Sequence, residues 1–570
     1  MITRCFYGTL SLLLFASLSS AQETTPAKPA DGDAGVAPSA ESAPANPPDA
    51  YAVVVPSAQA LPPTHVEQTG KPLDGAAKPG VLILANEPGG KAGLSLSFDL
   101  ESISDTVTPE ARLQLGMVEK LPVKRPVHST AERDVMTVYT GQGDAAKLVG
   151  SLPTKAGGSL NSYVIDITSA VNEALAKPPG QRKLQLDLRL DGKPLYYEAY
   201  GVSDGSQKPA PVLEVAPAKG WTDDWQKRLE PIATSSTVYR ESCLPLAENK
   251  DAEVKLSLLY PAKKIVEVIR AATGEAYEEG RDWVLKDGTL ILPVGSHVPI
   301  QIESEFFTQL TKGKDGNMKT SKVSVRLVPD TWYHNRQIAV SYEPASHDWS
   351  FAPPISSIND LPRLKKLLEA KAAVKVVLFG DSISAGGDCS GLHFVPPYQQ
   401  NYGQLVGREL ASHYGSDVTF LNPSRAGATS SYALVQADTQ VASFKPDLAI
   451  IAYGMNDRAP ERRVLHKENI EKIIDTIRNG SPDTEFIVVT PILNNPKQAT
   501  GLDPVKFIRD EALKIKRPGV AFVDMTTTEL DMLNHKSYLD LSGNGANHPN
   551  DFLHRIYAQR ILEVLLPPQK

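Results

Sequence analysis

The chain has 570 residues, of which 41% are hydrophobic and 22% are charged, and its formal net charge at pH 7 is -7. This length exceeds what one ordinary hydrophobic core occupies, so we expect several domains. The acidic balance gives no electrostatic reason to expect nucleic acid or an anionic membrane surface as a partner.

Residues 1–21 have the pattern of an export signal peptide. Arg4 precedes a short apolar core at 10–18, and Ser19-Ser20-Ala21 supplies the small residues of a cleavage site. No later segment approaches the roughly 20 apolar residues of a membrane span, so membrane insertion is not expected. We expect a bacterial product that is secreted to the periplasm or the exterior.

The next two segments differ sharply in pattern. Residues 22–50 are rich in Ala, Pro and Ser and predict a disordered linker. Residues 51–217 alternate with period two, perfectly so in K-L-Q-L-D-L-R-L at 183–190, which predicts strands of an antiparallel β-sandwich.

This segment also resembles the DNRLRE-type sandwich domain found beside carbohydrate-active enzymes of bacteria. The stretches that carry the resemblance are A-R-L-Q-L at Ala111, V-Y-T-G at Val138, Y-V-I-D-I-T-S-A-V-N-E-A-L at Tyr163, and P-V-L-E-V at Pro211. The resemblance implies adhesion to polysaccharide, and a structural spacer is the alternative.

Residues 218–350 predict a second β domain. They hold all five tryptophans and a hairpin sequence, W-V-L-K-D-G-T-L-I-L, in which Asp287-Gly288 suits a two-residue turn. The tryptophans either fill a core or stack on sugar rings, so the role of both β domains stays open. Cys243 and Cys389 remain after signal cleavage, and we expect two separate thiols.

In residues 351–570 strands alternate with helices, which predicts an α/β doubly wound, flavodoxin-like domain with a parallel sheet. The predicted strands are 374–379, 418–421, 448–453, 485–490 and 520–524, and the predicted helices are 402–413, 430–443, 462–478, 504–516 and 552–565. Ligands bind such folds at the carboxyl ends of the strands.

Four polar stretches stand at these strand ends or before the last helix. They are G-D-S at 380–382, N-P-S-R-A-G-A-T-S at 422–430, Y-G-M-N-D at 453–457 and N-G-A-N-H-P-N-D-F at 544–552. In this order they resemble the four motif blocks of the SGNH (GDSL-like) hydrolases over residues 372–566. The resemblance implies ester hydrolysis by Ser382 with His548 as base, and an oxyanion hole from the backbone N–H groups of Ser382 and Gly427 and the side-chain amide of Asn456.

Elementary chemistry explains these residue types. A serine hydroxyl is a poor nucleophile until an imidazole takes its proton, which His548 can do. Ser382, opening a helix after its strand, and Gly427, without a Cβ, can bring backbone N–H groups to the developing oxyanion. A second serine motif, G-V-S-D-G at 201–205, leads into a proline-rich turn with no helix, so we interpret Ser203 as a loop residue.

One position departs from the family pattern. The family commonly places an aspartate three residues before the histidine, where this chain has Gly545. The candidates to orient His548 are a backbone carbonyl near Gly545, Asp540 and Asp551. We predict the carbonyl, and therefore a Ser-His pair, because the loop is rich in glycine and Asp551 starts a helix.

The sequence predicts a secreted serine esterase that removes O-acetyl groups from a polysaccharide. The alternatives are an esterase for lipid, aryl or peptidoglycan esters, and a polysaccharide-binding protein with an inactive hydrolase domain. No cofactor is expected, and no convincing metal-binding spacing occurs.

Overall fold

The computed structural model describes most of residues 225–567, without 307, 313–317, 323–330, 394 and 498–500, together with the strands, one helix and a few adjoining residues between 52 and 215. The predicted signal peptide, the linker at 22–50 and Ser203 lie outside the described residues.

The C-terminal region is built on one parallel sheet. Its strands are β23 (Val374–Gly380), β24 (Val418–Leu421), β25 (Leu448–Ala452), β26 (Glu485–Val489) and β27 (Val520–Val523), in the order β24-β23-β25-β26-β27. The first strand lies between the second and third, which is the flavodoxin-like arrangement. The predicted parallel α/β domain is confirmed.

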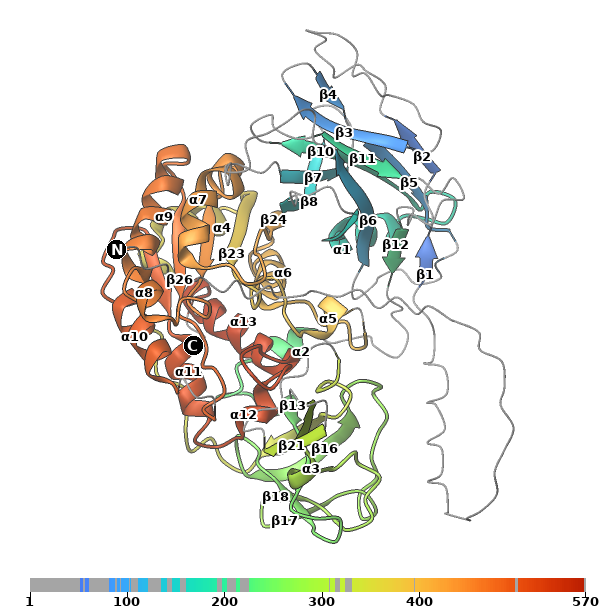
Figure 1. Cartoon of the computed structure of the whole chain (residues 1–570), viewed down its shortest axis with the longest axis vertical. Helices are drawn as coiled ribbons and strands as arrows, with labels where there is room; N and C mark the ends of the chain where they lie inside the picture. Colours follow the sequence, from blue (N-terminus) through green and yellow to red (C-terminus); the bar gives the residue numbers. More distant parts are fainter. Residues whose placement is uncertain are drawn as a thin grey trace, which may run out of the picture. The chain divides into compact units, whose positions relative to one another are not determined.

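Helices cover both faces of this sheet (Figure 1). Because successive side chains of a strand point to opposite faces, Val376 and Leu378 of β23 enter one buried cluster while Val377 and Phe379 enter another. The first cluster includes side chains of α6 (Tyr402–Tyr414) and α13 (Asp551–Leu565), and the second includes side chains of α7 (Ser430–Gln440) and α9 (His466–Gly480).

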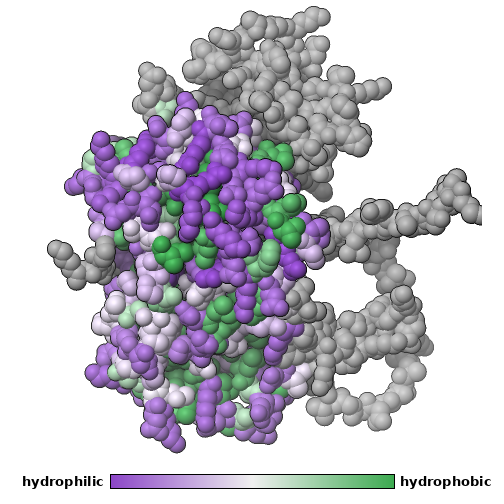
Figure 2. All heavy atoms as spheres, turned by 90° about the vertical axis from the view of Figure 1, so that its left-hand side faces the viewer, coloured by the Kyte–Doolittle hydropathy of each residue, from purple (hydrophilic) through white to green (hydrophobic). Residues whose placement is uncertain are grey.

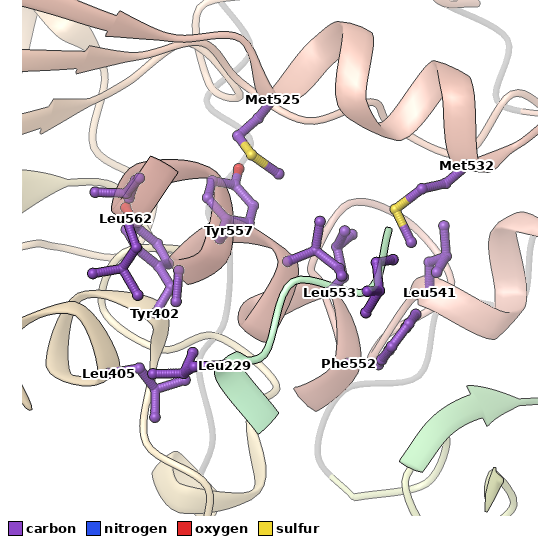
Figure 3. Packing of buried hydrophobic residues seen from close by; sticks show 14 of the residues in the cluster. Leu229, Tyr402, Leu405, Met525, Met532, Leu541, Phe552, Leu553, Tyr557 and Leu562 are labelled. Carbon is purple, nitrogen blue, oxygen red and sulfur yellow. The ribbon is translucent and has the colours of Figure 1, made fainter. Parts of the chain in front are cut away.

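Helix α13 is buried on nearly all sides, and its apolar side chains belong to the first cluster. Its Tyr557 ring stacks on the Tyr402 ring of α6 with centroids 4.7 Å apart. Figure 3 shows the neighbouring side chains of α2, α6, α11, α12 and α13 filling the space between these helices. This packing fixes the start of α13, which follows the loop that carries His548.

The other α-helices described within residues 225–567 are shorter. They are α2 (Trp225–Leu229), α3 (Glu303–Phe306), α4 (Pro362–Glu369), α5 (Ser390–His393), α8 (Pro460–Arg463), α10 (Asp503–Ala512), α11 (Met525–Met532) and α12 (Tyr538–Leu541).

The segment predicted as a second β domain forms small sheets. The largest is antiparallel, with the order β13 (Val238–Cys243), β22 (Ile338–Pro344) and β16 (Ala262–Arg270). The other strands are β14 (Leu246–Ala247), β15 (Val254–Leu256), β17 (Val284–Lys286), β18 (Thr289–Leu292), β19 (Gln301–Ile302), β20 (Thr308–Lys312) and β21 (Met318–Lys322).

The predicted hairpin is confirmed in this segment. β17 and β18 pair antiparallel, and Asp287 and Gly288 between them have φ values of 50° and 77°, as a turn with two left-handed residues requires. Val340 and Tyr342 of β22 belong to the same buried cluster as Leu364 and Phe552, so this β segment shares its core with the α/β region.

Between residues 52 and 215 the described strands pair in two antiparallel sheets. One has the order β1-β12-β6-β11-β3-β4, with β9 beside β6, and the other has the order β2-β5-β10-β7-β8. The elements are β1 (Ala52–Val54), β2 (Ser57–Ala60), β3 (Val81–Glu87), β4 (Gly90–Ala92), β5 (Leu94–Asp99), β6 (Ala111–Lys120), β7 (Val135–Thr140), β8 (Lys147–Pro153), β9 (Leu160–Asp166), α1 (Thr168–Leu175), β10 (Lys183–Asp191), β11 (Tyr197–Gly201) and β12 (Val212–Val215). The DNRLRE-like sandwich assignment stays a prediction.

The face of the molecule that carries α9 and α10 is mainly hydrophilic, with scattered hydrophobic side chains (Figure 2). Val464, Leu465 and Phe507 are among the exposed large hydrophobic residues, and single exposures of this kind are ordinary on protein surfaces. Among the residues that the structure describes, no helix is both long enough and apolar enough to cross a bilayer.

Candidate active site

Ser382 lies two residues beyond the carboxyl end of β23, where the sheet meets the loops. The Gly380 N–H donates to Ser424 Oγ at 2.9 Å and the Arg425 N–H donates to Gly380 O at 3.0 Å, so the loop after β24 is fixed beside the end of β23. The expected helix after Ser382 is only a run of turns, in which the Gly387 N–H donates to Ser382 O at 2.7 Å. The helix expectation is therefore wrong at this point.

His548 meets Ser382 directly. The Ser382 Oγ atom and the His548 Nε2 atom are 2.9 Å apart, within hydrogen-bond distance. The backbone of the loop before His548 is tied locally, since Asn544 Oδ1 accepts from the His548 N–H at 3.2 Å and Ser542 Oγ donates to His548 O at 3.1 Å. The structure thus brings together the two residues that the sequence predicts as nucleophile and base.

The other imidazole nitrogen of His548 faces a carboxylate that the sequence pattern did not reveal. His548 Nδ1 and Asp388 Oδ2 are 2.6 Å apart, and the Asp388 side chain is only 7% exposed. The prediction of a backbone carbonyl and a Ser-His pair is wrong, because a side-chain carboxylate occupies the position that orients the imidazole.

The three expected substitutes are all engaged elsewhere. Gly545 O accepts from Asn495 Nδ2 at 2.8 Å. Asp540 accepts from the Leu244 and Ser537 N–H groups at 2.7 and 3.0 Å, and Asp551 Oδ1 accepts from the Ser390 N–H at 2.8 Å. Asp388 stands 160 positions before His548 in the chain. Its only sequence signal is an aspartate after two glycines in the loop that follows Ser382.

Two glycines let the Asp388 loop approach the histidine loop. A Cβ at Gly387 would stand 2.9 Å from His548 Nδ1 and 2.8 Å from Ser382 O, and a Cβ at Gly543 would stand 2.5 Å from the Asp388 Cβ. These distances are too short for unbonded heavy atoms. The contacts from Ser382 through His548 to Asp388 therefore require glycine at both positions.

The predicted oxyanion-hole residues lie at the ends of the two strands that flank β23. Gly427, with φ at 74°, follows β24, and Asn456 follows β25. Asn456 Nδ2 donates to Ala428 O at 3.0 Å, which joins the two loops. Asp457 reinforces the junction by accepting from the Ser430 N–H and Oγ–H.

Charge in the site follows from burial and hydrogen bonding. Burial raises the pKa of the Asp388 carboxyl, but hydrogen bonds from His393 and His548 outweigh burial and hold that pKa below its usual value, so Asp388 is an anion at neutral pH. Burial raises the pKa of Asp381, next to the nucleophile, to about 7. Burial also lowers the pKa of His554 to about 4, which keeps that imidazole neutral beside the site.

Within the described part of the chain, no group of three His, Cys, Asp or Glu side chains is arranged to hold a metal ion. Cys243 and Cys389 are two free, buried thiols.

Residues 378–556 match the family model described as the GDSL-like Lipase/Acylhydrolase family. The C-terminal region contains a GDSL-like hydrolase domain. The chain is also 30% identical over 122 residues to an arylesterase of Vibrio mimicus, an alignment that covers 21% of this chain and 56% of the arylesterase. The chain therefore spans little more than half the length of that relative.

Two solved structures resemble the same region at low sequence identity. One is the acetylxylan esterase Axe2 of Geobacillus stearothermophilus, at 20% identity and a TM-score of 0.28, covering 34% of this chain and 96% of that one. The other is a two-domain esterase active on acetylated mannans, crystallised with mannopentaose, at 18% identity and a TM-score of 0.30, covering 37% of this chain and 54% of that one.

Proposed function

We propose that the chain is a carboxylic ester hydrolase in which Ser382 is the nucleophile. The observation that carries the proposal is the continuous line of three side chains, with Ser382 Oγ 2.9 Å from His548 Nε2 and His548 Nδ1 2.6 Å from Asp388 Oδ2. The match to the GDSL-like family and the similarity to an arylesterase support the same reaction.

The reaction proceeds in two balanced halves. His548 Nε2 takes the hydroxyl proton as Ser382 Oγ bonds to the ester carbonyl carbon, and returns it to the leaving alcohol as the ester C–O bond breaks. A water molecule then repeats the attack on the acyl-serine and releases the carboxylic acid. Asp388 holds the tautomer of His548 and stabilises its positive charge in both halves.

Gly427 and Asn456 serve the oxyanion. The Gly427 backbone N–H and the Asn456 amide are neutral donors that need no protonation change when the carbonyl oxygen becomes negative, and the Ser382 N–H is the third donor. Loss of one such donor typically raises the barrier by about 2.7–4 kcal/mol.

The test of the reaction is hydrolysis of 4-nitrophenyl acetate by the full chain. We expect Ser382→Ala and His548→Ala each to lower kcat by at least about 10⁴-fold. The matched control is Ser203→Ala, which removes the serine of the G-V-S-D-G motif at 201–205 and leaves the rate unchanged. Full activity in Ser382→Ala would contradict the proposal.

We infer further that the enzyme is exported and removes O-acetyl groups from a polysaccharide. The export-signal pattern of residues 1–21 and the two β regions before the hydrolase domain support this substrate class. The missing aspartate at Gly545 was the best reason to expect an inactive, merely binding protein, and Asp388 removes that reason.

The substrate class is tested by acetate release from an acetylated xylan or mannan by the full chain, compared with 4-nitrophenyl esters of increasing acyl length. We expect acetate release from the polymer and a fall in rate from acetate to octanoate. The arylesterase relative makes aryl esters the second candidate. Fast turnover of aryl esters without acetate release from any polysaccharide would favour that candidate.

A further inference from the structure

Asp388 accepts hydrogen bonds from two histidines, one on each carboxylate oxygen. Oδ2 faces His548 Nδ1 at 2.6 Å, and Oδ1 faces His393 Nε2 at 3.2 Å. His393 is the last residue of α5, five positions beyond Asp388, and its side chain is 20% exposed. Both contacts are therefore largely shielded from water.

The second histidine constrains the carboxylate. A carboxylate with one partner can turn about its last side-chain bond, whereas partners on both oxygens fix the plane of the group. The Asp388 backbone has φ at 61°, in the left-handed region that residues other than glycine adopt infrequently, although aspartate does so more readily than most. Backbone conformation and His393 together aim Oδ2 at His548.

We propose that His393 is a positioning residue of the hydrolase site, which holds Asp388 against His548 and adjusts how strongly the carboxylate supports the imidazolium form of His548. This inference rests on the proposed ester hydrolysis. It extends the site by one residue that acts through Asp388.

The His393 N–H acts on Asp388 from the carboxylate oxygen opposite to the one that faces His548. It fixes the plane of the carboxylate, and with it the distance and direction of Oδ2 from His548 Nδ1.

The other titratable groups around this pair come from two elements. His334, in the turn before β22, has a pKa lowered by burial, and His393 acts on it in the same direction. His554 of α13 has a pKa lowered by burial to about 4. Both imidazoles are therefore neutral at neutral pH. Asp551, at the start of α13, is the remaining acidic group near His334 and His554.

The experiment compares His393→Gln with His393→Ala in the full chain, using 4-nitrophenyl acetate between about pH 5 and 9. Glutamine places an amide N–H near the position of the histidine Nε2 and does not titrate. We expect His393→Gln to keep kcat at pH 8 within about threefold, because the amide N–H still holds the carboxylate of Asp388.

His393→Ala removes the donor. We expect kcat to fall by about tenfold with little change in KM, because the change affects the second partner of Asp388 and not the substrate site. The matched control is His413→Gln at an exposed position in the last turn of α6, which we expect to leave rate and profile unchanged.

Two outcomes overturn the inference. One is a wild-type kcat in His393→Ala. The other is an equal loss of kcat in His393→Ala and His393→Gln, which indicates a purely structural role. Failure of the hydrolase proposal is recognised separately, because it requires Ser382→Ala to retain activity.

Discussion

At the scale of single residues, the site depends on Asp388, which comes to His548 from the nucleophile loop and not from the histidine loop. The chemical requirement is only that a carboxylate face Nδ1 of the imidazole, and any segment that can reach this position satisfies it. Gly387 and Gly543 provide the close approach, since a side chain at either position would push the two loops apart.

We predict that Asp388→Asn lowers kcat/KM for a small acetyl ester by about 10³–10⁴-fold, because the amide no longer favours the correct tautomer and no longer stabilises the imidazolium. Asp540→Asn and Asp551→Asn, measured at the same pH, are expected to cost less than about tenfold in activity. A circular dichroism spectrum and melting temperature confirm that each variant folds. A loss near 10⁴-fold in either control, with a mild effect of Asp388→Asn, would contradict the assignment.

The sequence predicts Ser382 and His548 because both stand in short motifs with fixed neighbours. Asp388 has no such motif, and its role exists only after 160 positions of chain fold back on themselves. The sequence around His548 therefore does not contain the residue that orients it. Long-range pairing of this kind is a property of tertiary structure, which local patterns do not contain.

At the scale of elements, the five parallel strands are predicted to within a residue or two because continuous apolar runs identify buried strands. The helix α11 is missed for an equally physical reason. Its sequence, M-T-T-T-E-L-D-M, contains three threonines, which are poor helix formers.

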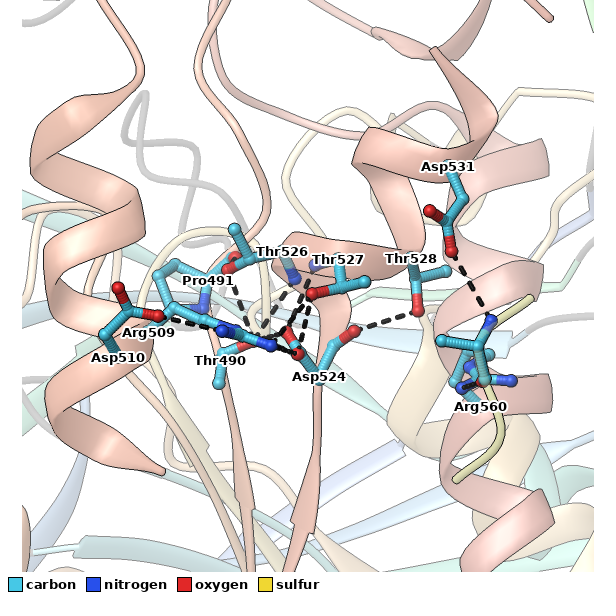
Figure 4. A network of polar contacts seen from close by, with 11 residues as sticks. Thr490, Pro491, Arg509, Asp510, Asp524, Thr526, Thr527, Thr528, Asp531 and Arg560 are labelled. Carbon is cyan, nitrogen blue, oxygen red and sulfur yellow. Dashed lines mark hydrogen bonds and ion pairs between the residues drawn. The ribbon is translucent and has the colours of Figure 1, made fainter. Parts of the chain in front are cut away.

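Tertiary contacts overcome that low propensity (Figure 4). Asp524 caps α11 by accepting from the Thr527 N–H at 3.1 Å, and its Oδ2 also accepts from Arg509 Nε of α10 at 2.9 Å. Thr490, just after β26, donates to Asp524 Oδ1 at 3.2 Å. Asp524 therefore connects the ends of β26 and β27 to α10 and α11, and α11 begins directly after this capping residue.

The strand β22 contributes to the active site through the residue before it. Gln337 is 2% exposed, and its Nε2 donates to Ser542 O at 2.9 Å and to Leu539 O at 3.0 Å, while its Oε1 accepts from Asn550 Nδ2 at 3.2 Å. These contacts hold both ends of the loop that carries His548. A residue of the β segment thus fixes the position of the predicted base.

We predict that Gln337→Ala lowers kcat by about tenfold or more with little change in KM, and lowers the free energy of unfolding by about 1–3 kcal/mol because buried carbonyls lose their donor. The measurements are steady-state kinetics and urea unfolding. Gln226→Ala removes an exposed glutamine that donates to Ser412 Oγ, and serves as the control with no expected effect. Equal kcat and equal stability in Gln337→Ala and Gln226→Ala would show that the β segment does not position the loop that carries His548.

At the scale of the whole molecule, buried carboxyl groups link stability to pH. Glu529 of α11 is fully buried; its Oε2 accepts from the Leu493 N–H at 2.5 Å, and its Oε1 has no hydrogen-bond partner among the described residues. Burial raises the pKa of Glu529 to about 8, although the hydrogen bond from Leu493 opposes this change.

We predict that Glu529→Gln is near neutral for stability at about pH 5 and stabilising at about pH 9. The unfolded chain releases the Glu529 proton near pH 4.3, whereas the folded chain keeps it until about pH 8, so the contribution of this group to stability falls as pH rises between these values. A pKa that differs by 1 between the folded and unfolded chain changes the free energy of unfolding by about 1.4 kcal/mol. The measurement is urea unfolding of the wild type and of Glu529→Gln at both pH values. If the difference in the free energy of unfolding between them does not change with pH, the prediction is contradicted.

The β segment and the α/β region also share a buried ion pair, which the strand pattern of the sequence gives no reason to expect. Lys536, between α11 and α12, donates from Nζ to Glu241 Oε1 of β13 at 2.6 Å, and both side chains are fully buried. Lys536 Nζ also donates to Ser257 O at 2.9 Å, and Glu241 Oε2 accepts from the Tyr342 hydroxyl at 2.8 Å. Period-two alternation predicts strands but not which of their polar residues will face another segment's charge.

We predict that Lys536→Met and Glu241→Gln each lower the free energy of unfolding by about 3–5 kcal/mol, because each leaves the opposite charge buried without its partner. The double variant is expected to lose less than the sum of the two, since neither charge then remains. The control cycle uses Glu468 and Lys472 on α9, an ion pair whose side chains are 59% and 55% exposed and which we expect to contribute less than about 1 kcal/mol.

Unfolding is followed by tryptophan fluorescence, which reports mainly on the β segment, and by loss of esterase activity, which reports on the α/β region. If the two regions form one cooperative unit, both signals change in the same transition, and the Lys536 and Glu241 variants shift both signals together. Separate transitions would show that the β segment unfolds independently of the α/β region. A coupling energy between Lys536 and Glu241 no larger than that between Glu468 and Lys472 would show the same.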